Sequence, residues 1–281
     1  MRLARAAYVR PYDVYFFDVD GTVCLGEQAI PGAPQVLAAL RAAGRSVHFI
    51  TNDASKTREA HVARLTRAGI AARGEEILIP TSILSRTLAE RHLGGRVLVL
   101  GESAVEEALA AAGLIPVGEP DGVEAVVVSH DRRLDFARLT AAFRAVRHGA
   151  TLYATNADPR RPTADGGEPG AGAVLAAVER ASGVKASLIF GKPGREMQRE
   201  LLRRIGPRTN GSLVVGDQLE TDIRLGSDCG LDTALVLTGV DDDRTAPAGV
   251  RPTYVLEDLA TLVAPDPAGG RLDAVECRRG S

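Results

Sequence analysis

The feature that most constrains the fold is an alternation between short β-branched runs and longer stretches with helical spacing. The run at 14–17 has the composition of a buried strand and is followed by a helical stretch at 31–44. A second run at 46–50 is followed by a helical stretch at 57–68. Neighbouring parallel strands need a long crossover, which is usually a helix. The alternation therefore predicts an α/β fold, with parallel sheets covered by helices on both faces.

Further strands continue this pattern. They are predicted at 77–79, 97–100, 124–129, 151–155, 187–190, 212–215 and 233–237. Polar residues suited to chemistry collect before residue 60 and between residues 190 and 225, whereas the middle of the chain has strands and helices without them. We therefore predict a Rossmann-like core domain formed by residues 1–82 and 188–281, with a second α/β domain, residues 83–187, inserted into it.

The composition is that of an ordinary globular protein. The net charge of −2 over 281 residues gives no electrostatic reason to expect binding to nucleic acid or to an anionic membrane. No apolar run approaches the ~20 residues that span a bilayer, and the basic N-terminus lacks an apolar segment of signal-peptide length. Cys24, Cys229 and Cys277 lie too far apart for a zinc motif. Together these features predict a cytoplasmic location.

Two acidic residues follow the first predicted strand. The sequence YFFDVDGT places Asp18 at the C-terminal end of that strand, where open α/β sheets bind ligands. One apolar residue separates Asp18 from Asp20, so both side chains can project from one tight turn. Gly21 permits a turn conformation that residues with a side chain avoid. The paired carboxylates indicate a catalytic or metal-binding site.

Three later strands end in polar residues. Thr51 and Asn52 follow the second strand and offer donors to phosphate oxygens. Lys192 follows another strand and is one of three lysines among 34 basic residues. Asp217 ends a further strand, with Asp222 five residues later. Because the C-terminal ends of parallel strands lie at one edge of a sheet, we expect all these side chains to converge there.

These segments resemble the motifs of the haloacid dehalogenase superfamily of aspartate-nucleophile phosphatases. The resemblance is to the capped subfamily IIA, which includes nitrophenyl phosphatases, phosphoglycolate phosphatases and NagD-like enzymes, and it covers residues 13–260. It implies that the inserted domain is a large C2-type α/β cap that determines substrate specificity. The matching segments are DVDGT (18–22), TNDASKT (51–57), ATNADPRRPTADGGEPGAG (154–172), GKP (191–193) and GDQLETDI (216–223).

The resemblance implies Mg²⁺-dependent hydrolysis of a small phosphate monoester. Asp18 would attack phosphorus to form an aspartyl phosphate, and Asp20 would act as general acid and then as general base. The implied metal ligands are the carboxylates of Asp18 and Asp217 and the backbone carbonyl of Asp20. Asp222 would orient a metal-bound water rather than bind the ion directly. Lys192 would offset the crowded negative charge. The implied phosphate-binding residues are Thr51, Asn52 and Lys192.

Three residues of the inserted domain are candidates for contact with the leaving group. His130 occupies a position that faces the substrate in similar proteins, and Arg160 and Arg161 suit a carboxylate or a phosphate. The alternative is an arginine-rich loop that contacts solvent. The nearby GGEPGAG (166–172) lacks the arrangement of a dinucleotide-binding motif and is interpreted as a loop entering a cap helix. Similar proteins often dimerise through the cap, so the resemblance also suggests a homodimer.

Two other functions are compatible with these residues. A phosphotransferase or mutase of the same superfamily would use the same nucleophile with another acceptor, although the large insert argues against it. A non-catalytic ligand-binding module could retain the fold, but Asp18, Asp20, Lys192 and Asp217 are all present. We therefore expect an enzyme that acts on a small phosphorylated metabolite.

Overall fold

The structure, a computed structural model, describes residues 3–161, 167–207, 209–241 and 249–265. The chain divides into two compact units. Unit 1 comprises residues 1–49, 64–72 and 205–281, and unit 2 comprises residues 50–63 and 73–204. The domain boundaries suggested by the sequence, after residues 82 and 187, stay a prediction, because a compact unit does not by itself mark where a domain is inserted.

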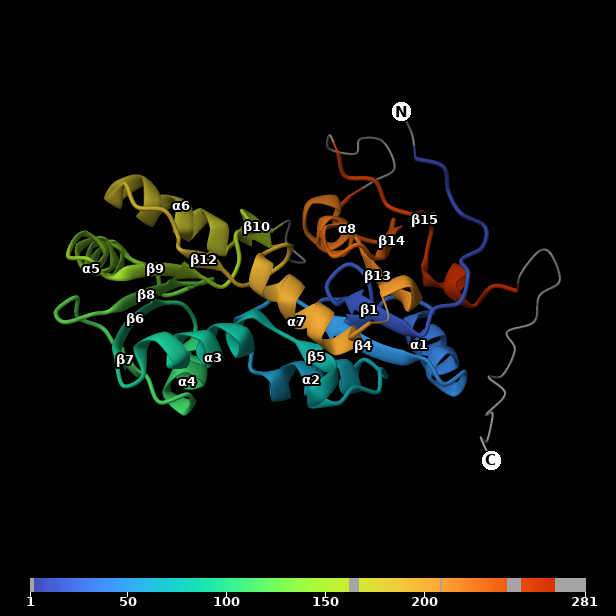
Figure 1. The fold of residues 1–281 in the computed structure, drawn as a ribbon, viewed down its shortest axis with the longest axis horizontal. Coiled ribbons are helices and arrows are strands. Elements are labelled where there is room, and N and C mark those ends of the chain that lie inside the picture. The colour runs from blue at the N-terminus through green and yellow to red at the C-terminus, as the bar shows by residue number, and fades with distance from the viewer. Residues whose placement is uncertain (1–2, 162–166, 208, 242–248, 266–281) are drawn as a thin grey trace. The chain divides into compact units, whose positions relative to one another are not determined.

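Figure 1 labels the main elements in chain order. The strands are β1 (Val14–Asp18), β2 (Cys24–Leu25), β3 (Gln28–Ala29), β4 (Ser46–Ile50), β5 (Ile77–Leu78), β6 (Arg96–Leu100), β7 (Ile115–Val117), β8 (Ala125–Val128), β9 (Thr151–Ala154), β10 (Arg160–Arg161), β11 (Glu168–Pro169), β12 (Leu188–Ile189), β13 (Ser212–Gly216), β14 (Asp232–Val236) and β15 (Tyr254–Leu256).

The helices follow the strands in the expected alternation. The α-helices are α1 (Ala33–Ala42), α2 (Arg58–Arg67), α3 (Pro80–His92), α4 (Ser103–Ala111), α5 (Phe136–Arg147), α6 (Ala171–Ser182), α7 (Arg195–Ile205) and α8 (Arg224–Asp228). Short 3-10 turns are η1 (Gly74–Glu76), η2 (Thr209–Gly211) and η4 (Leu259–Val263), and η3 (Leu219–Ile223) is a π-helical turn. Within the described residues, no helix combines the length and apolar character needed to cross a membrane.

Among the described residues, the sheet of unit 1 has the strand order β15-β14-β13-β1-β4. In unit 1, β1 pairs in parallel with β13, β13 with β14, and β14 with β15. Every residue of β1 and β13 is buried. Burial on both faces explains why these strands are continuous apolar runs rather than alternating ones. Phe17 lies opposite Val215, so the residues that follow the two strands are neighbours.

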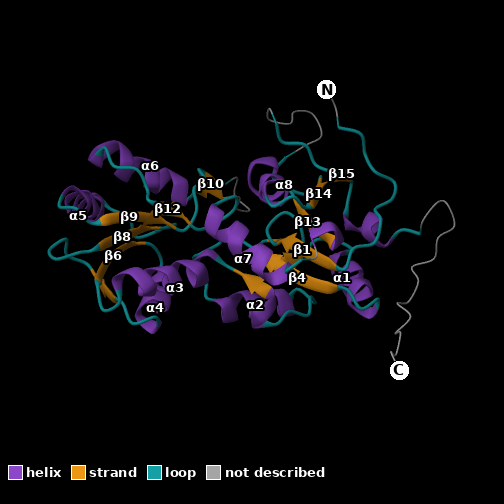
Figure 2. Cartoon of the chain, viewed as in Figure 1, coloured by secondary structure: helices purple, strands orange, loops and turns teal. Residues whose placement is uncertain are grey.

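Unit 2 contains its own parallel sheet, with the order β12-β9-β8-β6-β7. Figure 2 shows α3 and α4 on one face of this sheet and α5 and α6 on the other. Its apolar core joins strand residues such as Val126 and Leu152 to the helix residues Val146 and Val178. The unit is therefore a second α/β layer structure, as the strand and helix alternation in the middle of the chain predicts.

The predicted fold class, an α/β fold with parallel sheets, is confirmed. Each predicted strand lies close to its expected position. The strands that the sequence did not reveal have two or three residues each, which is too short for a period to be visible. They are β2, β3, β7, β10, β11 and β15.

Two cysteines lie inside the described part of the chain. Cys24 and Cys229 are both buried, and burial raises the pKa of each thiol to about 11. Cys277 lies outside the described residues. The two buried thiols are therefore protonated at neutral pH.

Candidate active site

Three buried carboxylates meet in unit 1. Asp18 is the last residue of β1, Asp217 directly follows β13, and Asp222 lies in η3. One carboxylate oxygen from each residue lies within 4.8 Å of the other two. Their relative exposures are 6%, 0% and 1%. The structure thus brings together the first and last acidic segments that the sequence analysis singled out.

Glycines make room for these carboxylates. A Cβ at Gly21 or at Gly239 would overlap the carboxylate of Asp217, and a Cβ at Gly216 would overlap the side chain of Asp222. Gly21 also has a φ of +90°, in the region that favours glycine, as expected from the DVDGT segment. The glycines beside the acidic residues are therefore required by packing as well as by turn conformation.

The carboxylate cluster fits a divalent cation. Val240 N donates to Asp217 Oδ2 at 2.8 Å, and Gln218 N donates to Asp222 Oδ2 at 3.1 Å, so two of the carboxylates are held in place. Ionised carboxylates this close repel one another, and a cation between them removes that repulsion. Carboxylate oxygens are also the ligands that Mg²⁺ prefers. Asp18, Asp217 and Asp222 therefore suit a magnesium site.

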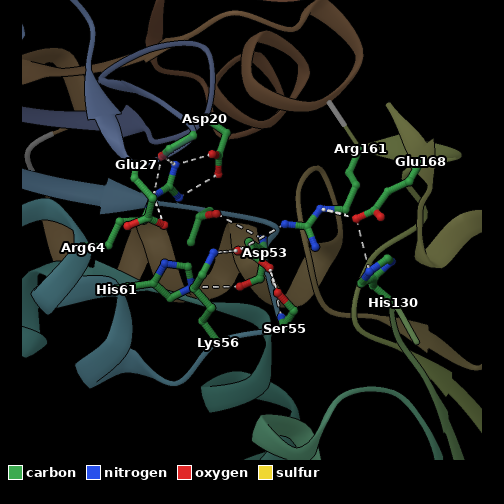
Figure 3. Close-up of polar contacts among 12 residues, drawn as sticks. Asp20, Glu27, Asp53, Ser55, Lys56, His61, Arg64, His130, Arg161 and Glu168 are labelled. Atoms are coloured by element: carbon green, nitrogen blue, oxygen red, sulfur yellow. Dashed lines mark hydrogen bonds and ion pairs between the residues drawn. The ribbon is translucent and has the colours of Figure 1, made fainter. Parts of the chain in front are cut away.

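An arginine holds the side chain of Asp20. Arg64 Nη2 donates to Asp20 Oδ1 at 2.6 Å, and Arg64 Nη1 donates to Asp20 Oδ2 at 3.3 Å (Figure 3). Arg64 Nε also donates to the carbonyl oxygen of Gly26 at 2.9 Å. Because Arg64 is 2% exposed, its planar guanidinium is fixed between the turn after β1 and the β2–β3 hairpin. The orientation of Asp20 is thus set by a rigid, two-pronged contact.

In unit 2, the predicted phosphate-binding residues lie together. Thr51 and Lys192 are both buried. The backbone N of Lys192 donates to Asn52 Oδ1 at 2.7 Å, and Lys192 Nζ donates to the carbonyl oxygen of Ile50 at 3.5 Å. A Cβ at Gly191 would overlap Asn52, which accounts for the glycine of the GKP segment. The structure therefore joins two motifs that are 140 residues apart.

Asn52 and Thr51 differ in how the protein uses their polar groups. Asn52 Nδ2 donates to Asp158 Oδ2 at 3.0 Å and to the carbonyl oxygen of Lys192 at 3.2 Å. Thr51 Oγ1 accepts a hydrogen bond from Asp53 N at 3.0 Å, and a hydroxyl that accepts can still donate its own proton. The amide of Asn52 thus ties neighbouring segments together, and its contact with phosphate stays a prediction.

Asp53 is the centre of a charged network in unit 2 (Figure 3). Lys56 Nζ lies 3.2 Å from Asp53 Oδ2, and Arg161 Nη2 lies 3.7 Å from the same oxygen. Burial opposes ionisation, but Lys56, His61 and Arg161 outweigh it and hold the pKa of Asp53 below its usual range. Asp53 therefore carries a fixed negative charge beside Thr51.

The structure separates the three candidate residues for contact with the leaving group. Arg160 and Arg161 are neighbours on β10, so their side chains point to opposite faces. Arg160 is exposed, whereas Arg161 Nε lies 3.5 Å from Oε1 of Glu168, the residue opposite it on β11. The same Glu168 oxygen lies 3.4 Å from His130 Nε2. His130 and Arg161 thus share one carboxylate, and their contact with a substrate stays a prediction.

Known proteins share both the sequence and the fold of this chain. Two family models match it: haloacid dehalogenase-like hydrolase over residues 15–115 and HAD-hydrolase-like over residues 189–262. The chain is 38% identical over 265 residues to chronophin from Mus musculus, covering 88% of this chain and 90% of that protein. It is 37% identical over 296 residues to glycerol-3-phosphate phosphatase from Homo sapiens, covering 92% of each. The chain belongs to the haloacid dehalogenase-like hydrolases.

A solved structure extends this similarity to three dimensions. The crystal structure of glycerol phosphate phosphatase from Mycobacterium tuberculosis in complex with magnesium matches with a TM-score of 0.80 and 36% identity, covering 91% of this chain and 81% of that chain. The relatives are phosphatases, and this chain is a phosphatase of the haloacid dehalogenase superfamily. The family predicted from the motifs is therefore confirmed.

Several residues around this hydrolase site were not found from the sequence. Asp53 and Asp158 lie within segments that resemble family motifs, so the sequence marked their positions, but it did not predict their partners. Arg64 looks like an ordinary charge on an amphipathic helix. Glu168 stands in the glycine-rich segment that was interpreted as a loop, and that loop does lead into α6.

Proposed function

We propose that the protein is a Mg²⁺-dependent phosphatase that hydrolyses a small phosphate monoester through an aspartyl-phosphate intermediate. The observation that carries this proposal is the group of three buried carboxylates, Asp18, Asp217 and Asp222, whose oxygens lie within 4.8 Å of one another. Asp18 would be the nucleophile and Asp20 the general acid and base. Membership in the haloacid dehalogenase-like hydrolases supports this assignment.

The metal would be held by the carboxylates of Asp18 and Asp217 and by the backbone carbonyl of Asp20. Asp222, whose Oδ2 accepts a hydrogen bond from Gln218 N, would orient water at this site. A bound Mg²⁺ supplies positive charge that offsets the negative charge of the phosphoryl group. The related glycerol phosphate phosphatase with magnesium supports this choice of ion.

The protein's own groups would carry the two chemical steps. Asp18 attacks phosphorus while the bond from phosphorus to the leaving oxygen breaks, and Asp20 gives its proton to that oxygen. Water then attacks the aspartyl phosphate, Asp20 takes the proton from this water, and the carboxylate of Asp18 is released with inorganic phosphate. Thr51 and Lys192 would bind phosphoryl oxygens, with Asn52 supporting Lys192 through its side-chain oxygen.

The names of several relatives, glycerol-3-phosphate phosphatase, D-glycerol 3-phosphate phosphatase and acid sugar phosphatase, support a small substrate. We propose a small phosphorylated metabolite as the substrate, with no nucleic acid and no membrane partner. A homodimer through the predicted cap and a cytoplasmic location stay predictions from the sequence.

Turnover of nitrophenyl phosphate tests this function. Purified protein should hydrolyse it with added Mg²⁺, and a chelator should remove the activity until Mg²⁺ is restored. Asp18→Asn should lower kcat by at least ~10³-fold, because an amide is a far weaker nucleophile than a carboxylate. Asp121→Asn, which changes an exposed aspartate, is the matched control and should leave kcat unchanged. Full activity in Asp18→Asn would exclude Asp18 as the nucleophile.

A further inference from the structure

Glu168 joins three cationic or titratable side chains in unit 2. Its Oε1 lies 3.1 Å from Arg132 Nη2, 3.4 Å from His130 Nε2 and 3.5 Å from Arg161 Nε. Figure 3 shows His130 and Arg161 approaching this carboxylate from two sides. Within the described residues, His130 Nε2 is buried and forms no hydrogen bond, so it lies close to Glu168 without being hydrogen-bonded to it.

Arg161 lies between two carboxylates. Its Nε faces Glu168 at 3.5 Å, and its Nη2 faces Asp53 at 3.7 Å. The backbone N of Asp53 donates to Thr51 Oγ1 at 3.0 Å, so the guanidinium reaches the loop that contains the predicted phosphate-binding threonine. The guanidinium of Arg161 therefore lies near the loop that contains Thr51, and its positive charge is already offset by Asp53 and Glu168.

Both carboxylates remain ionised at neutral pH. Burial opposes ionisation of Glu168, but Arg132, His130 and Arg161 hold the pKa of Glu168 below its usual value. The pKa of Asp53 is lowered in the same direction. A carboxylate on the leaving group of a phosphate ester would therefore be repelled by Glu168 and would have to compete with Glu168 for Arg161.

An uncharged hydroxyl would meet the opposite situation. A hydroxyl can donate to Glu168 and accept from Arg161 or from a ring nitrogen of His130. His130 Nε2 and Arg161 Nε lie 3.4 Å and 3.5 Å from Glu168 Oε1. The cluster is thus better matched to a neutral, hydroxyl-bearing leaving group than to a carboxylate.

We propose that Glu168 determines substrate selectivity by neutralising Arg161, so that the enzyme prefers phosphate esters with a polyol leaving group over those with a carboxylate on the leaving group. This inference rests on the proposed phosphatase function. Removing the charge of Glu168 converts Arg161, together with Arg132 and His130, into a receptor for an anion.

Two small substrates of similar size test this inference. Glycerol 3-phosphate has a neutral polyol leaving group, and 2-phosphoglycolate has a leaving group with a carboxylate. The wild-type protein should have a kcat/KM at least ~10-fold higher for glycerol 3-phosphate. Glu168→Gln should raise the ratio of phosphoglycolate to glycerol phosphate kcat/KM by at least ~10-fold. Adding Arg161→Gln to Glu168→Gln should abolish that gain.

Glu106→Gln removes a partly exposed carboxylate that pairs with Arg133 at 3.2 Å in the same unit, and it should change the ratio less than about two-fold. An unchanged ratio in Glu168→Gln, or a wild-type preference for phosphoglycolate, overturns the inference. If Glu168→Gln does not fold, the test uses the wild type and Arg161→Gln. The ratio of phosphoglycolate to glycerol phosphate kcat/KM should be low in the wild type and lower still in Arg161→Gln. If the wild type does not hydrolyse nitrophenyl phosphate, the proposed phosphatase function is overturned instead.

Discussion

The two carboxylate clusters of this phosphatase differ in how their acidic side chains are arranged. In unit 1, Asp18, Asp217 and Asp222 are buried with their oxygens within 4.8 Å of one another. In unit 2, Asp53 and Glu168 alternate with cations, since Arg161 lies within 3.7 Å of both. Arg161 therefore bridges the two acidic residues of the second cluster, whereas the first cluster gathers three carboxylates in one place.

The difference separates a site for a cation from a site for a neutral group. Three gathered carboxylates are favourable when a divalent ion is bound between them. Carboxylates interleaved with guanidinium and ammonium groups balance their own charge and leave little attraction for an added ion. This difference supports the proposals that phosphoryl chemistry takes place at the first cluster and that the second cluster recognises the leaving group.

Replacing a ligand of the first cluster tests the comparison most strongly. Asp217→Asn should lower kcat/KM for nitrophenyl phosphate by ~10²–10³-fold, because a charged metal ligand is lost. Mg²⁺ should also raise the Tm of the wild type but not of Asp217→Asn, since an ion that binds the folded state stabilises it. Asp222→Asn should have a smaller effect of about 10–100-fold. An unchanged Mg²⁺ requirement in both variants would separate these residues from the metal.

The contact between Arg64 and Asp20 provides the next test. Arg64→Lys replaces a fixed guanidinium fork by a single ammonium group, so Asp20 should lose its orientation and kcat should fall about 10–100-fold with little change in KM. If Arg64 acts through Asp20, Arg64→Lys in an Asp20→Asn background should lower kcat by less than about two-fold further. A full additional loss in that background would show that Arg64 acts elsewhere.

Arg67→Lys is the matched control for this test. Arg67 lies on the same helix and pairs with Glu27 at 2.8 Å, but its side chain is 63% exposed. Its replacement should leave kcat within about two-fold of the wild type, because exposed ion pairs contribute little.

The smallest expected effect concerns the stability of the second cluster. Asp53→Asn should lower the free energy of unfolding by about 1–2 kcal/mol at pH 7, because Lys56 and Arg161 lose a charged partner. The pKa of Asp53 is lower in the folded state, so its stabilising effect is complete above its unfolded pKa of about 4 and is lost as the pH falls below that value. Urea denaturation of both proteins between pH 3 and pH 7 measures this difference.

A pH-independent difference would contradict the assigned ionisation of Asp53. Glu220→Gln is the control, since Glu220 is 58% exposed and pairs with Arg224 on the surface. It should change the free energy of unfolding by less than about 0.5 kcal/mol at any pH in this range.

The sequence by itself determined the strands that carry Asp18, Thr51, Lys192 and Asp217. Asp18, Thr51 and Asp217 end or follow strands of one sheet, and parallel strands place such ends at one edge. Lys192 instead follows the half-buried strand β12, which belongs to the second sheet. Asp18 ends β1 and Asp217 directly follows the adjacent strand β13, which confirms this argument for unit 1. The glycine after the DVD segment was also predictable, because its backbone adopts a conformation that other residues avoid.

Tertiary structure alone decided which side chains meet. Arg64 reaches Asp20 across 44 residues of sequence, and Glu168 meets Arg161 through two-residue strands that show no period. Local periodicity reports which face of an element is buried, but it does not report which element packs there. The orientation of Asp20 and the charge balance around Arg161 depend on such distant pairings. The sequence therefore identified the candidate catalytic carboxylates, whereas the fold determined the partners of their neighbours.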